Sequence, residues 1–152
     1  GKAEYGGAVI KDLAGGGVIR YKDFRVNKTS LMKTTVGALA FDSNGIIYAG
    51  TCKSYTSGGV FEGTGLYVSL DDGLTWENTG LQENNILSLA VDGDDNVFAG
   101  TEDNGIFMSG NSGDSWRSIG PPASGETRMI RTDSEGSLYA VVNYNKLYIG
   151  IK

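Results

Sequence analysis

The stretch SLDDGLTWENTG, residues 69–80, returns in altered form as SGNSGDSWRSIG, residues 109–120. Both copies begin with serine, carry an acid or amide two positions on and a glycine two positions after that, and place a hydroxyl residue directly before tryptophan. A stretch that occurs twice is either a chemical centre used twice or a structural element that recurs because the fold repeats. The sequence on either side of the two copies decides between these interpretations.

Three longer stretches of the chain align with one another without a gap. They begin at Val36, Ile86 and Thr127, and read VGALAFDSNGIIYAGT, ILSLAVDGDDNVFAGT and TRMIRTDSEGSLYAVV. Their apolar residues alternate with a period of two, which is typical of strands and not of helices. An aspartate opens the middle of each stretch, where its side chain can bond the backbone two residues on in a turn. Each stretch therefore predicts two antiparallel strands joined by a tight turn.

A third strand is predicted after each pair, in the segments GLYVSL, GIFMSG and KLYIGI. The first two of these segments lead directly into the serine-to-tryptophan stretch, and a short fourth segment then leads to the next repeat. We name the four strands of the unit A to D in chain order. The unit repeats after 50 residues from Val36 to Ile86 and after 41 from Ile86 to Thr127. The difference lies between strands B and C, where residues 51–65 form a longer connection than residues 101–105.

Antiparallel units of four strands and about 40 residues are typical of β-propeller blades, which pack face to face. The predicted fold class is therefore all-β, a β-propeller with about three to three and a half blades in this chain. The blade boundaries are expected at residues 1–35 (partial), 36–85, 86–126 and 127–152 (partial).

The two ends of the predicted propeller raise the question of closure, because closed propellers hold four to eight blades. The chain is expected to be part of a propeller, or one half of a dimeric ring. GVIRYKD, residues 17–23, resembles the C strand of an earlier blade. Since an unpaired strand edge attracts a partner strand, we expect residues 17–24 to complete the sheet of residues 127–152, either in a second copy or within one chain.

The composition removes several classes of chemistry. The 152 residues include no histidine, which excludes Ser-His-Asp and Cys-His catalysis and histidine-ligated metal. Cys52 is the sole cysteine, so neither an internal disulfide nor a thiolate cluster can form. The net charge of −5, with acids and bases interspersed, gives no basic surface for nucleic acid. No apolar run of 18 residues occurs, so membrane insertion is not expected.

One segment imitates a metal site. DGDDN, residues 92–96, opens like a calcium loop, and Asp103 falls at its twelfth position. The glycine that this loop requires is replaced by Val97, and the matching tetrad of the first repeat, DSNG, has no additional acids. We interpret the segment as a hairpin turn, and we expect neither a bound metal nor a cofactor.

The serine-to-tryptophan stretch resembles a known motif. Its first copy matches every fixed position of the Asp-box, or bacterial neuraminidase repeat, and its second copy keeps the serine, the glycine and the tryptophan. The chain from about residue 17 onward thus resembles the Asp-box propellers of the sialidase-like superfamily, and it is also similar to propeller repeats of bacterial surface proteins and sensor ectodomains. The motif residues are Ser69, Asp71, Gly73, Thr75 and Trp76 in the first copy and Ser109, Asn111, Gly113, Ser115 and Trp116 in the second.

We expect these motif residues to be structural. Asp71 can accept backbone N–H groups in the hairpin between strands C and D, Gly73 permits a positive φ, and Trp76 supplies a large apolar plate. The second copy has Asn111 where the first has Asp71. An amide can replace a carboxylate that only accepts hydrogen bonds, whereas it cannot replace a general acid.

Ligand binding is expected at the other end of the blades. Because successive strands of a blade run in opposite directions, the A–B and C–D loops lie at one end of a propeller and the B–C and D–A loops at the opposite end. In the resembled family, the substrate sites lie at the B–C and D–A end. Aromatic, amide and charged side chains there can stack on and hydrogen-bond a sugar, although ordinary solvated turns have the same composition. The candidate ligand-binding residues are Lys53, Tyr55, Phe61, Glu102, Asp103, Asn143 and Tyr144.

Two functions remain open after this reading. The first is a non-catalytic module that binds a glycan or a protein partner. The second is a fragment of an Asp-box glycoside hydrolase, sialidase-like or xyloglucanase-like, with catalytic residues partly outside this chain. No arginine stands in the arginine-bearing motif that the resemblance requires of a sialidase, so no catalytic residue is assigned. The expected location is extracytoplasmic (periplasmic, secreted or on the cell surface), although this chain shows no signal segment.

Overall fold

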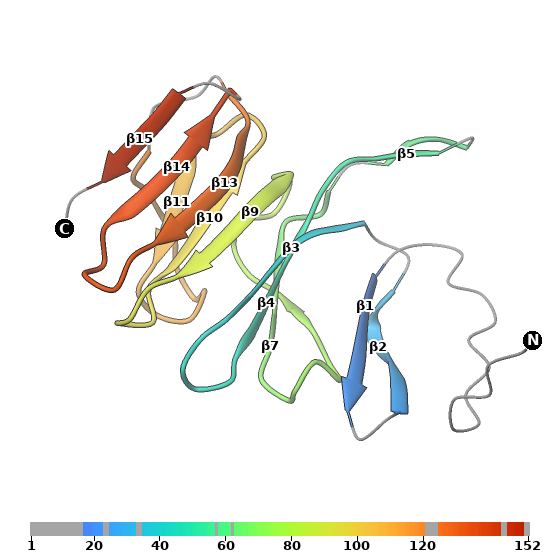
Figure 1. Ribbon diagram of the computed structural model, residues 1–152. Helices are drawn as coiled ribbons and strands as arrows, with labels where there is room; N and C mark the ends of the chain where they lie inside the picture. The colour runs from blue at the N-terminus through green and yellow to red at the C-terminus, as the bar shows by residue number, and fades with distance from the viewer. Residues whose placement is uncertain are drawn as a thin grey trace, which may run out of the picture.

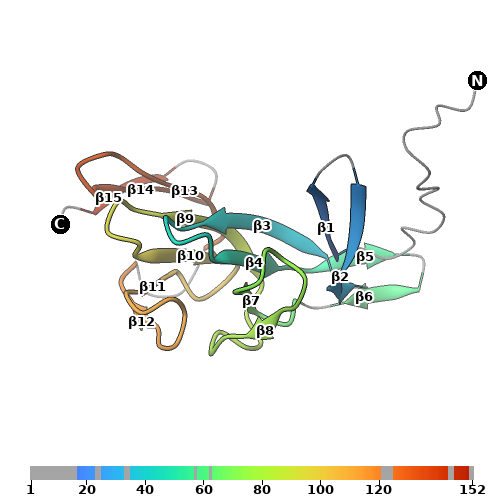
Figure 2. The same cartoon turned by 90° about the horizontal axis from the view of Figure 1, so that it is seen from below.

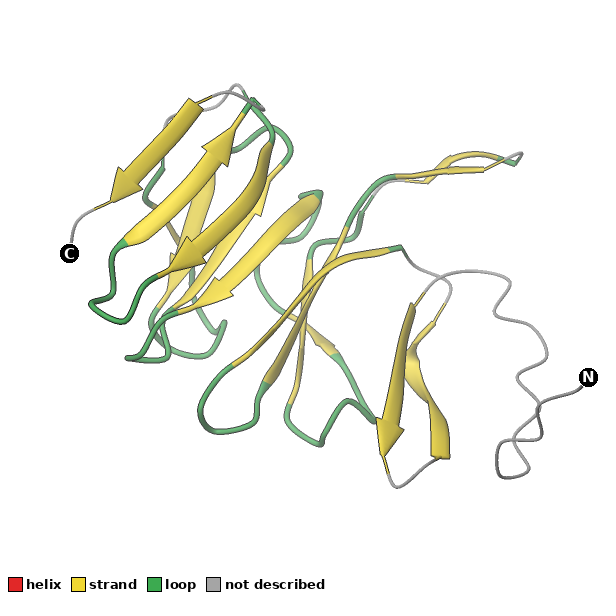
Figure 3. Cartoon of the chain, viewed as in Figure 1, coloured by secondary structure: helices red, strands yellow, loops and turns green. Residues whose placement is uncertain are grey.

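The computed structural model describes residues 17–22, 25–32, 35–56, 58–61, 63–120, 125–143 and 146–150. These residues form strands, turns and loops without a helix, which confirms the all-β prediction (Figure 3). None of the described segments is therefore a helix that could cross a membrane.

Three antiparallel sheets correspond to the three aligned repeats. Blade 1 has the strand order β3-β4-β7-β8, blade 2 has the order β9-β10-β11-β12, and blade 3 has the order β13-β14-β15. Their bounds are β3 Val36–Phe41, β4 Ile47–Thr51, β7 Leu66–Ser69, β8 Glu77–Asn78, β9 Ile86–Val91, β10 Val97–Thr101, β11 Ile106–Ser109, β12 Arg117–Ser118, β13 Thr127–Thr132, β14 Leu138–Val142 and β15 Lys146–Gly150. Blades 1 and 2 contain strands A to D in chain order, and the described part of blade 3 contains strands A to C, so the predicted blade architecture is confirmed.

Two hairpins lie outside these three sheets. The first joins β1 (Gly17–Lys22) to β2 (Arg25–Met32), and the second joins β5 (Ser54–Thr56) to β6 (Gly59–Phe61) within the long B–C connection of blade 1. Figures 1 and 2 show the three blades in succession, with β15 at one end and the β1–β2 hairpin at the other. Closure of the sheet of blade 3 by residues 17–22 of the same chain is therefore wrong, because β1 pairs with β2 in a separate sheet.

The blades pack through their faces, and small residues on strand B allow the close approach. A Cβ atom at Gly50 would lie 2.5 Å from Cγ2 of Ile86, the first residue of the next blade. A Cβ at Gly100 would lie 2.7 Å from the carbonyl oxygen of Thr127, the first residue of blade 3. The glycine of the repeated alanine-glycine pair thus faces the following blade, whereas the alanine faces the preceding unit, since Ala49 packs with Leu31 and Ala99 packs in the cluster between blades 1 and 2.

Two apolar clusters lie between the blades. The first joins blades 1 and 2 and includes Tyr48, Leu66, Ile86 and Val97. The second joins blades 2 and 3, and its members are Ala90, Phe98, Ile106, Ile130, Leu138 and Ala140. Apart from Leu81 in a D–A connection, the buried members of both clusters come from strands A, B and C, which explains why the alternation in the sequence marks these strands most clearly.

Candidate functional site

The loops of the blades gather at two opposite ends of the sheets. At one end, the A–B turn of blade 1 contacts the A–B turn of blade 2, where Ser43 donates its backbone N–H and its hydroxyl to the carboxylate of Asp95. At the other end, Gly63 of a B–C connection donates its backbone N–H to Oδ1 of Asn85 in a D–A connection. Each loop thus lies at the end of the molecule that the alternating direction of successive strands requires.

The first serine-to-tryptophan stretch forms the C–D hairpin of blade 1. Asp71 accepts hydrogen bonds from the backbone N–H of Thr75 at 2.8 Å and from its hydroxyl at 2.5 Å, while Oγ of Ser69 accepts the backbone N–H of Gly73 at 2.8 Å. The bonds from Thr75 lower the pKa of Asp71 to about 2. Gly73 has φ 82°, a left-handed conformation that suits glycine.

The second copy makes the same set of contacts with an uncharged residue at its centre. Oδ1 of Asn111 accepts the backbone N–H of Ser115 at 3.0 Å, and its Nδ2 donates to Oγ of Ser115 at 2.9 Å. Ser109 accepts the backbone N–H of Gly113 at 2.9 Å. Asn111 keeps the backbone bond but donates to the following hydroxyl where Asp71 accepts from it, so the position works without a carboxylate, which supports a hydrogen-bonding role and not acid–base chemistry.

Both tryptophans of the motif pack against the unit that precedes them. Trp116 of blade 2 packs on the cluster between blades 1 and 2, and Trp76 of blade 1 packs on the cluster of Leu31 and Ala49. Each indole N–H is bonded within its own hairpin, to the carbonyl of Gly113 and of Gly73 respectively, at 3.1 Å. The two indoles therefore lie in different interfaces and do not share a cleft.

A polar cluster at the B–C/D–A end brings together residues of two blades and the connection between them. Glu102, which follows β10, accepts hydrogen bonds at Oε2 from Nζ of Lys53 at 3.1 Å and from Nδ2 of Asn85 at 2.9 Å. Its backbone N–H also bonds to the carbonyl of Asn85 at 3.0 Å. We call Lys53, Asn85 and Glu102 the polar cluster. Its carboxylate is held between a cation and an amide by charge-assisted hydrogen bonds.

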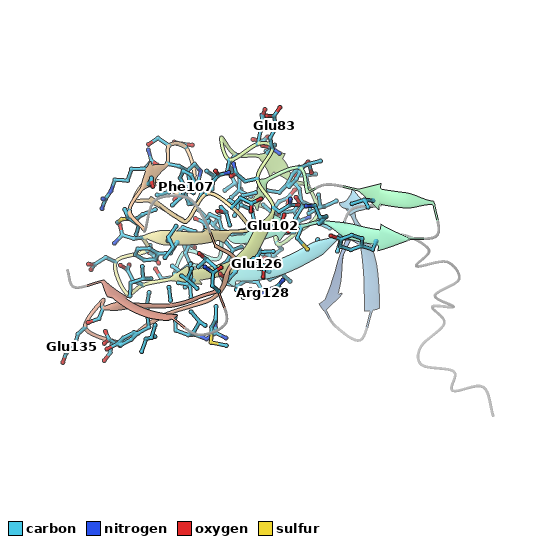
Figure 4. The ribbon with its side chains drawn as sticks, turned by 90° about the horizontal axis from the view of Figure 1, so that it is seen from above. Glu83, Glu102, Phe107, Glu126, Arg128 and Glu135 are labelled. Carbon is cyan, nitrogen blue, oxygen red and sulfur yellow. The ribbon has the colours of Figure 1, made fainter. Side chains whose placement is uncertain are left out.

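Blade 3 adds a second charged pair next to this cluster. Nε of Arg128 at the start of β13 lies 2.6 Å from Oε2 of Glu126. Burial raises the pKa of the Cys52 thiol, the negative charge of Glu102 adds to this effect, and the positive charge of Arg128 opposes it. Cys52 thus lies within electrostatic reach of both Glu102 and Arg128, and it remains a neutral thiol. Figure 4 shows the labelled residues Glu102, Glu126 and Arg128 near one another in the middle of the view.

The remaining predicted ligand residues are spread more widely. Tyr55 lies on the β5–β6 hairpin, which extends away from the blades, and its side chain is 76% exposed. Asp103 is exposed beside Glu102, and Asn143 at the end of β14 donates its backbone N–H to the carbonyl of Glu126. Phe61 lies on β6, but its side chain is outside the described part of the structure, as is the whole of Tyr144. Among the described residues of the predicted set, Lys53 and Glu102 are in direct contact.

Two contributors could not be singled out from the sequence. Asn85 fell within the D–A connections expected at this end, but its role depends on contacts with residues 22 and 17 positions away, Gly63 and Glu102. Arg128 entered the sequence analysis only through the statement that no arginine stands in the arginine-bearing motif of a sialidase. Its position at the start of an A strand, directly after a D–A loop, was the available signal.

The first carboxylate of the acidic turn, residues 92–96, accepts hydrogen bonds from groups within the turn itself. Oδ1 of Asp92 accepts the backbone N–H groups of Asp94 and Asn96, each at 2.9 Å. The side-chain amide of Asn96 bonds to both carboxylate oxygens. The segment is a hairpin turn held by its leading aspartate, as the turn chemistry of the repeat predicts.

Comparison with known proteins supports the fold alone. No family model and no curated protein matches the chain. A solved structure of a GH74 xyloglucanase from Xanthomonas campestris is similar with a TM-score of 0.53 and 15% identity, over 89% of this chain and 23% of that one. The extracellular domain of a putative one-component system from B. thetaiotaomicron aligns with a TM-score of 0.46 and 19% identity, over 88% of this chain and 24% of that one. The chain thus spans about a quarter of each solved structure, and its fold is that of partial propeller blades.

Proposed function

We propose that this chain is a non-catalytic β-propeller module that binds a neutral polysaccharide at its B–C/D–A end. The observation that carries the proposal is the polar cluster, in which Lys53 and Asn85 fix the carboxylate of Glu102 from two sides. A fixed set of donors and acceptors orients the hydroxyl groups of a sugar. The exposed ring of Tyr55, on the hairpin that follows Lys53, offers an apolar face with a polar tip on which a sugar ring can stack.

The charges at this end favour a neutral ligand over an acidic one. Lys53 is paired with Glu102, and Arg128 is paired with Glu126, so each cation is already matched by a carboxylate. The chain as a whole carries a net charge of −5, which would repel a polyanion. The similarity to a xyloglucanase, whose substrate is a neutral polymer, suggests xyloglucan as the first probe.

Affinity gel electrophoresis with xyloglucan in the gel tests this proposal. We expect the polysaccharide to retard the protein, and we expect Tyr55→Ala and Glu102→Gln each to weaken binding about tenfold, equivalent to ~1.4 kcal/mol. Leu74→Ala is the matched control, because Leu74 is exposed at the opposite end. The proposal is wrong if retardation is absent, or if it is the same for Tyr55→Ala as for the unchanged protein.

Glu102 also supports a second candidate, a fragment of an Asp-box glycoside hydrolase. Glycosidases use two carboxylates across the scissile bond, and Glu126, directly before β13, stands in a D–A loop at the same end as the B–C loop of Glu102. The bonds from Lys53 and Asn85 nevertheless suit an acceptor better than an acid. Release of reducing sugar from xyloglucan that Glu102→Gln abolishes would favour this candidate over the binding module.

We further propose that the two C–D hairpins are Asp-boxes and that the protein acts outside the cytoplasm. The bonds that Asp71 and Asn111 accept from the backbone N–H of the residue four positions on support the first part. The likeness of the fold to a polysaccharide-degrading enzyme supports the second. Fractionation of cells that express the gene tests the location, and recovery in the cytoplasm alone would contradict it.

A homodimer that completes the propeller is part of the same proposal. Leu39 of blade 1 and Leu147 of blade 3 are exposed by 46% and 63%, whereas Leu89 and Leu66, which hold the matching positions in blades 2 and 1, are buried. Each end of the chain thus offers an apolar face of the kind that a neighbouring blade covers elsewhere. Sedimentation should show a dimer that Leu39→Asp dissociates, and a monomer at all concentrations would contradict this part.

A further inference from the structure

The three side chains of the polar cluster carry the groups that an amide exchange requires. Lys53 has a primary amine, Asn85 has an amide, and the carboxylate of Glu102 lies between them. Oε2 of Glu102 accepts a hydrogen bond from Nζ of Lys53 at 3.1 Å and from Nδ2 of Asn85 at 2.9 Å. The amine and the amide are therefore neighbours, since both nitrogens are bound to the same oxygen atom. Reactants that are held together in this way react far faster than they would in free solution.

The carbonyl group of the Asn85 amide is polarised from its other side. Its Oδ1 accepts the backbone N–H of Gly63 at 2.7 Å. Gly63 is buried, so this donor is shielded from water. A Cβ atom at Gly63 would lie 2.7 Å from the same Oδ1 and 2.5 Å from the carbonyl oxygen of Thr51, so a larger residue would not fit. An N–H group in this position stabilises the negative charge that develops on Oδ1 when a nucleophile adds to Cγ.

Glu102 is placed to prepare the amine for attack. A lysine attacks as a neutral amine, so its ammonium group must first give up a proton to a base. The carboxylate of Glu102 is that base, because it is in direct contact with Nζ. The side chains of Lys53 and Glu102 are only 26% and 20% exposed. Partial removal from water disfavours the charged forms of both groups, so it favours the transfer of a proton between them.

We propose that Nζ of Lys53 and Cγ of Asn85 form an intramolecular isopeptide bond, with Glu102 as the group that moves the protons. The Nζ–Cγ bond forms and the Cγ–Nδ2 bond breaks. Glu102 accepts protons from Nζ and passes them to Nδ2, which leaves as ammonium, so the carboxylate is restored at the end. The reaction uses no oxidant, metal or cofactor, and it occurs once in each molecule.

The cross-link joins two connections at the B–C/D–A end. Lys53 lies in the long B–C connection of blade 1, directly before the β5–β6 hairpin, and Asn85 lies directly before β9. Because Cys52 is the sole cysteine, an internal disulfide cannot fasten these connections. An isopeptide bond constrains the chain in the same way as a disulfide, by different chemistry. The cross-link does not depend on the proposed binding of a polysaccharide, because all the reacting groups belong to this chain.

Trypsin digestion of the intact purified protein, followed by mass spectrometry, tests for the bond. Trypsin cuts after lysine and arginine, and neither occurs in residues 54–116. Without the cross-link, the digest contains the peptides 34–53 and 54–117. With the cross-link, Lys53 is acylated and resists trypsin, so we expect a single peptide of residues 34–117, lighter than its sequence by one ammonia molecule. No sugar is present, so this outcome is separate from that of the polysaccharide-binding test.

Three variants and a matched control assign the roles of the groups. Lys53→Arg and Asn85→Ala should each abolish the lighter peptide, because the nucleophile or the amide is then missing. Glu102→Gln should slow its formation at least about a hundredfold, since a positioned acid–base group contributes this much or more to a rate. Asn84→Ala is the control and should keep the lighter peptide, because the side chain of Asn84 bonds to Asn104 and not to Glu102.

Each of several results would overturn the proposal. Recovery of the peptides 34–53 and 54–117 alone, with unaltered masses, would show that the three side chains form hydrogen bonds only. A loss of ammonia that persists in Lys53→Arg would come from cyclisation of an asparagine and not from a cross-link. A peptide lighter by one water molecule would place the new amide at Glu102 instead of Asn85. Equal rates in the unchanged protein and in Glu102→Gln would remove the carboxylate from the reaction.

Discussion

The interface between blades 1 and 2 and the interface between blades 2 and 3 come from the same repeat, but they are held by different contacts. The first is filled by Trp116 and clamped by Asp95 on Ser43. The second contains a groove, and its cross-blade bonds run from Ser88 to the carbonyl of Thr127 at 2.7 Å and from Thr132 to the carbonyl of Val91 at 2.9 Å. The backbone of a blade is therefore repeated more faithfully than the side chains that join it to its neighbour.

The largest effect is expected for Trp116→Ala. This change empties the first interface, so the free energy of unfolding should fall by about 3 kcal/mol, as for other large-to-small aromatic changes in cores. Guanidinium denaturation followed by circular dichroism measures it. The control is Leu74→Ala at an exposed hairpin position, which should change stability by less than about 0.5 kcal/mol. A similarly small loss for Trp116→Ala would mean that the indole does not fill the interface.

The role of this tryptophan illustrates what the sequence could predict. The motif, its hairpin and its structural character follow from residues that lie within eight positions of one another, and their bonds are local in the structure. The A, B and C strands are predicted by the alternation of apolar and polar residues and by the alignment of the repeats. The ligand-binding role predicted for the B–C/D–A end depends on which loops lie together there. This also follows from the alternating direction of the strands.

Contacts between distant residues could not be predicted in the same way. Lys53 and Glu102 are 49 positions apart, and their ion pair depends on how the long connection of blade 1 bends toward blade 2. The β5–β6 hairpin formed within a segment that we expected only to lengthen this connection. Alignment of repeats gives no information about an insertion that occurs once.

A second, slightly smaller effect is expected for Gly100→Val. A Cβ at this position would lie 2.7 Å from backbone and side-chain atoms of Thr127, so valine would push blade 3 away from blade 2. We expect a loss of about 2 kcal/mol in the free energy of unfolding, as for other overpacked cores. Blade 3 provides the control, because Val141 naturally stands at the matching position of β14. Val141→Gly should cost only about 1 kcal/mol, and an equal loss in both variants would contradict the close-approach argument.

The clamp of the first interface should have a smaller effect. Bonds from the hydroxyl and backbone of Ser43 lower the pKa of Asp95 below its ordinary value. Its stabilising contribution is thus fully present at neutral pH and is lost as the pH falls through the ordinary range and then the lowered pKa. Asp95→Ala should reduce the Tm at pH 7 and leave it nearly unchanged at low pH. The same reduction at both pH values would show that the carboxylate is not the source.

The reverse experiment transfers the clamp to the second interface. Gly93→Ser combined with Gly136→Asp places the two partners where blades 2 and 3 meet. The double variant should have a higher Tm than the sum of the two single variants implies, since neither residue forms the bond alone. Additive effects would indicate that the two turns do not approach each other.

The smallest effect is expected in the two C–D hairpins. The pKa of Asp71 is lowered to about 2, so its contribution is present above the ordinary value of 3.8 and is lost as the pH falls toward 2. Asp71→Asn should remove this part of the acid dependence and leave the hairpin bonds intact, as Asn111 does in the second copy. Denaturation curves between pH 6 and pH 2 measure the difference. An acid dependence unchanged by Asp71→Asn would contradict the assignment.

The most direct test of the structural role of the repeated stretches is the surroundings of Trp116 in solution. Nuclear Overhauser contacts from its indole protons to methyl groups of the cluster between blades 1 and 2, formed by Leu66, Leu81 and Val97 among others, are the expected result. Contacts confined to residues of its own hairpin, with an indole open to water, would show that the tryptophan does not join the blades.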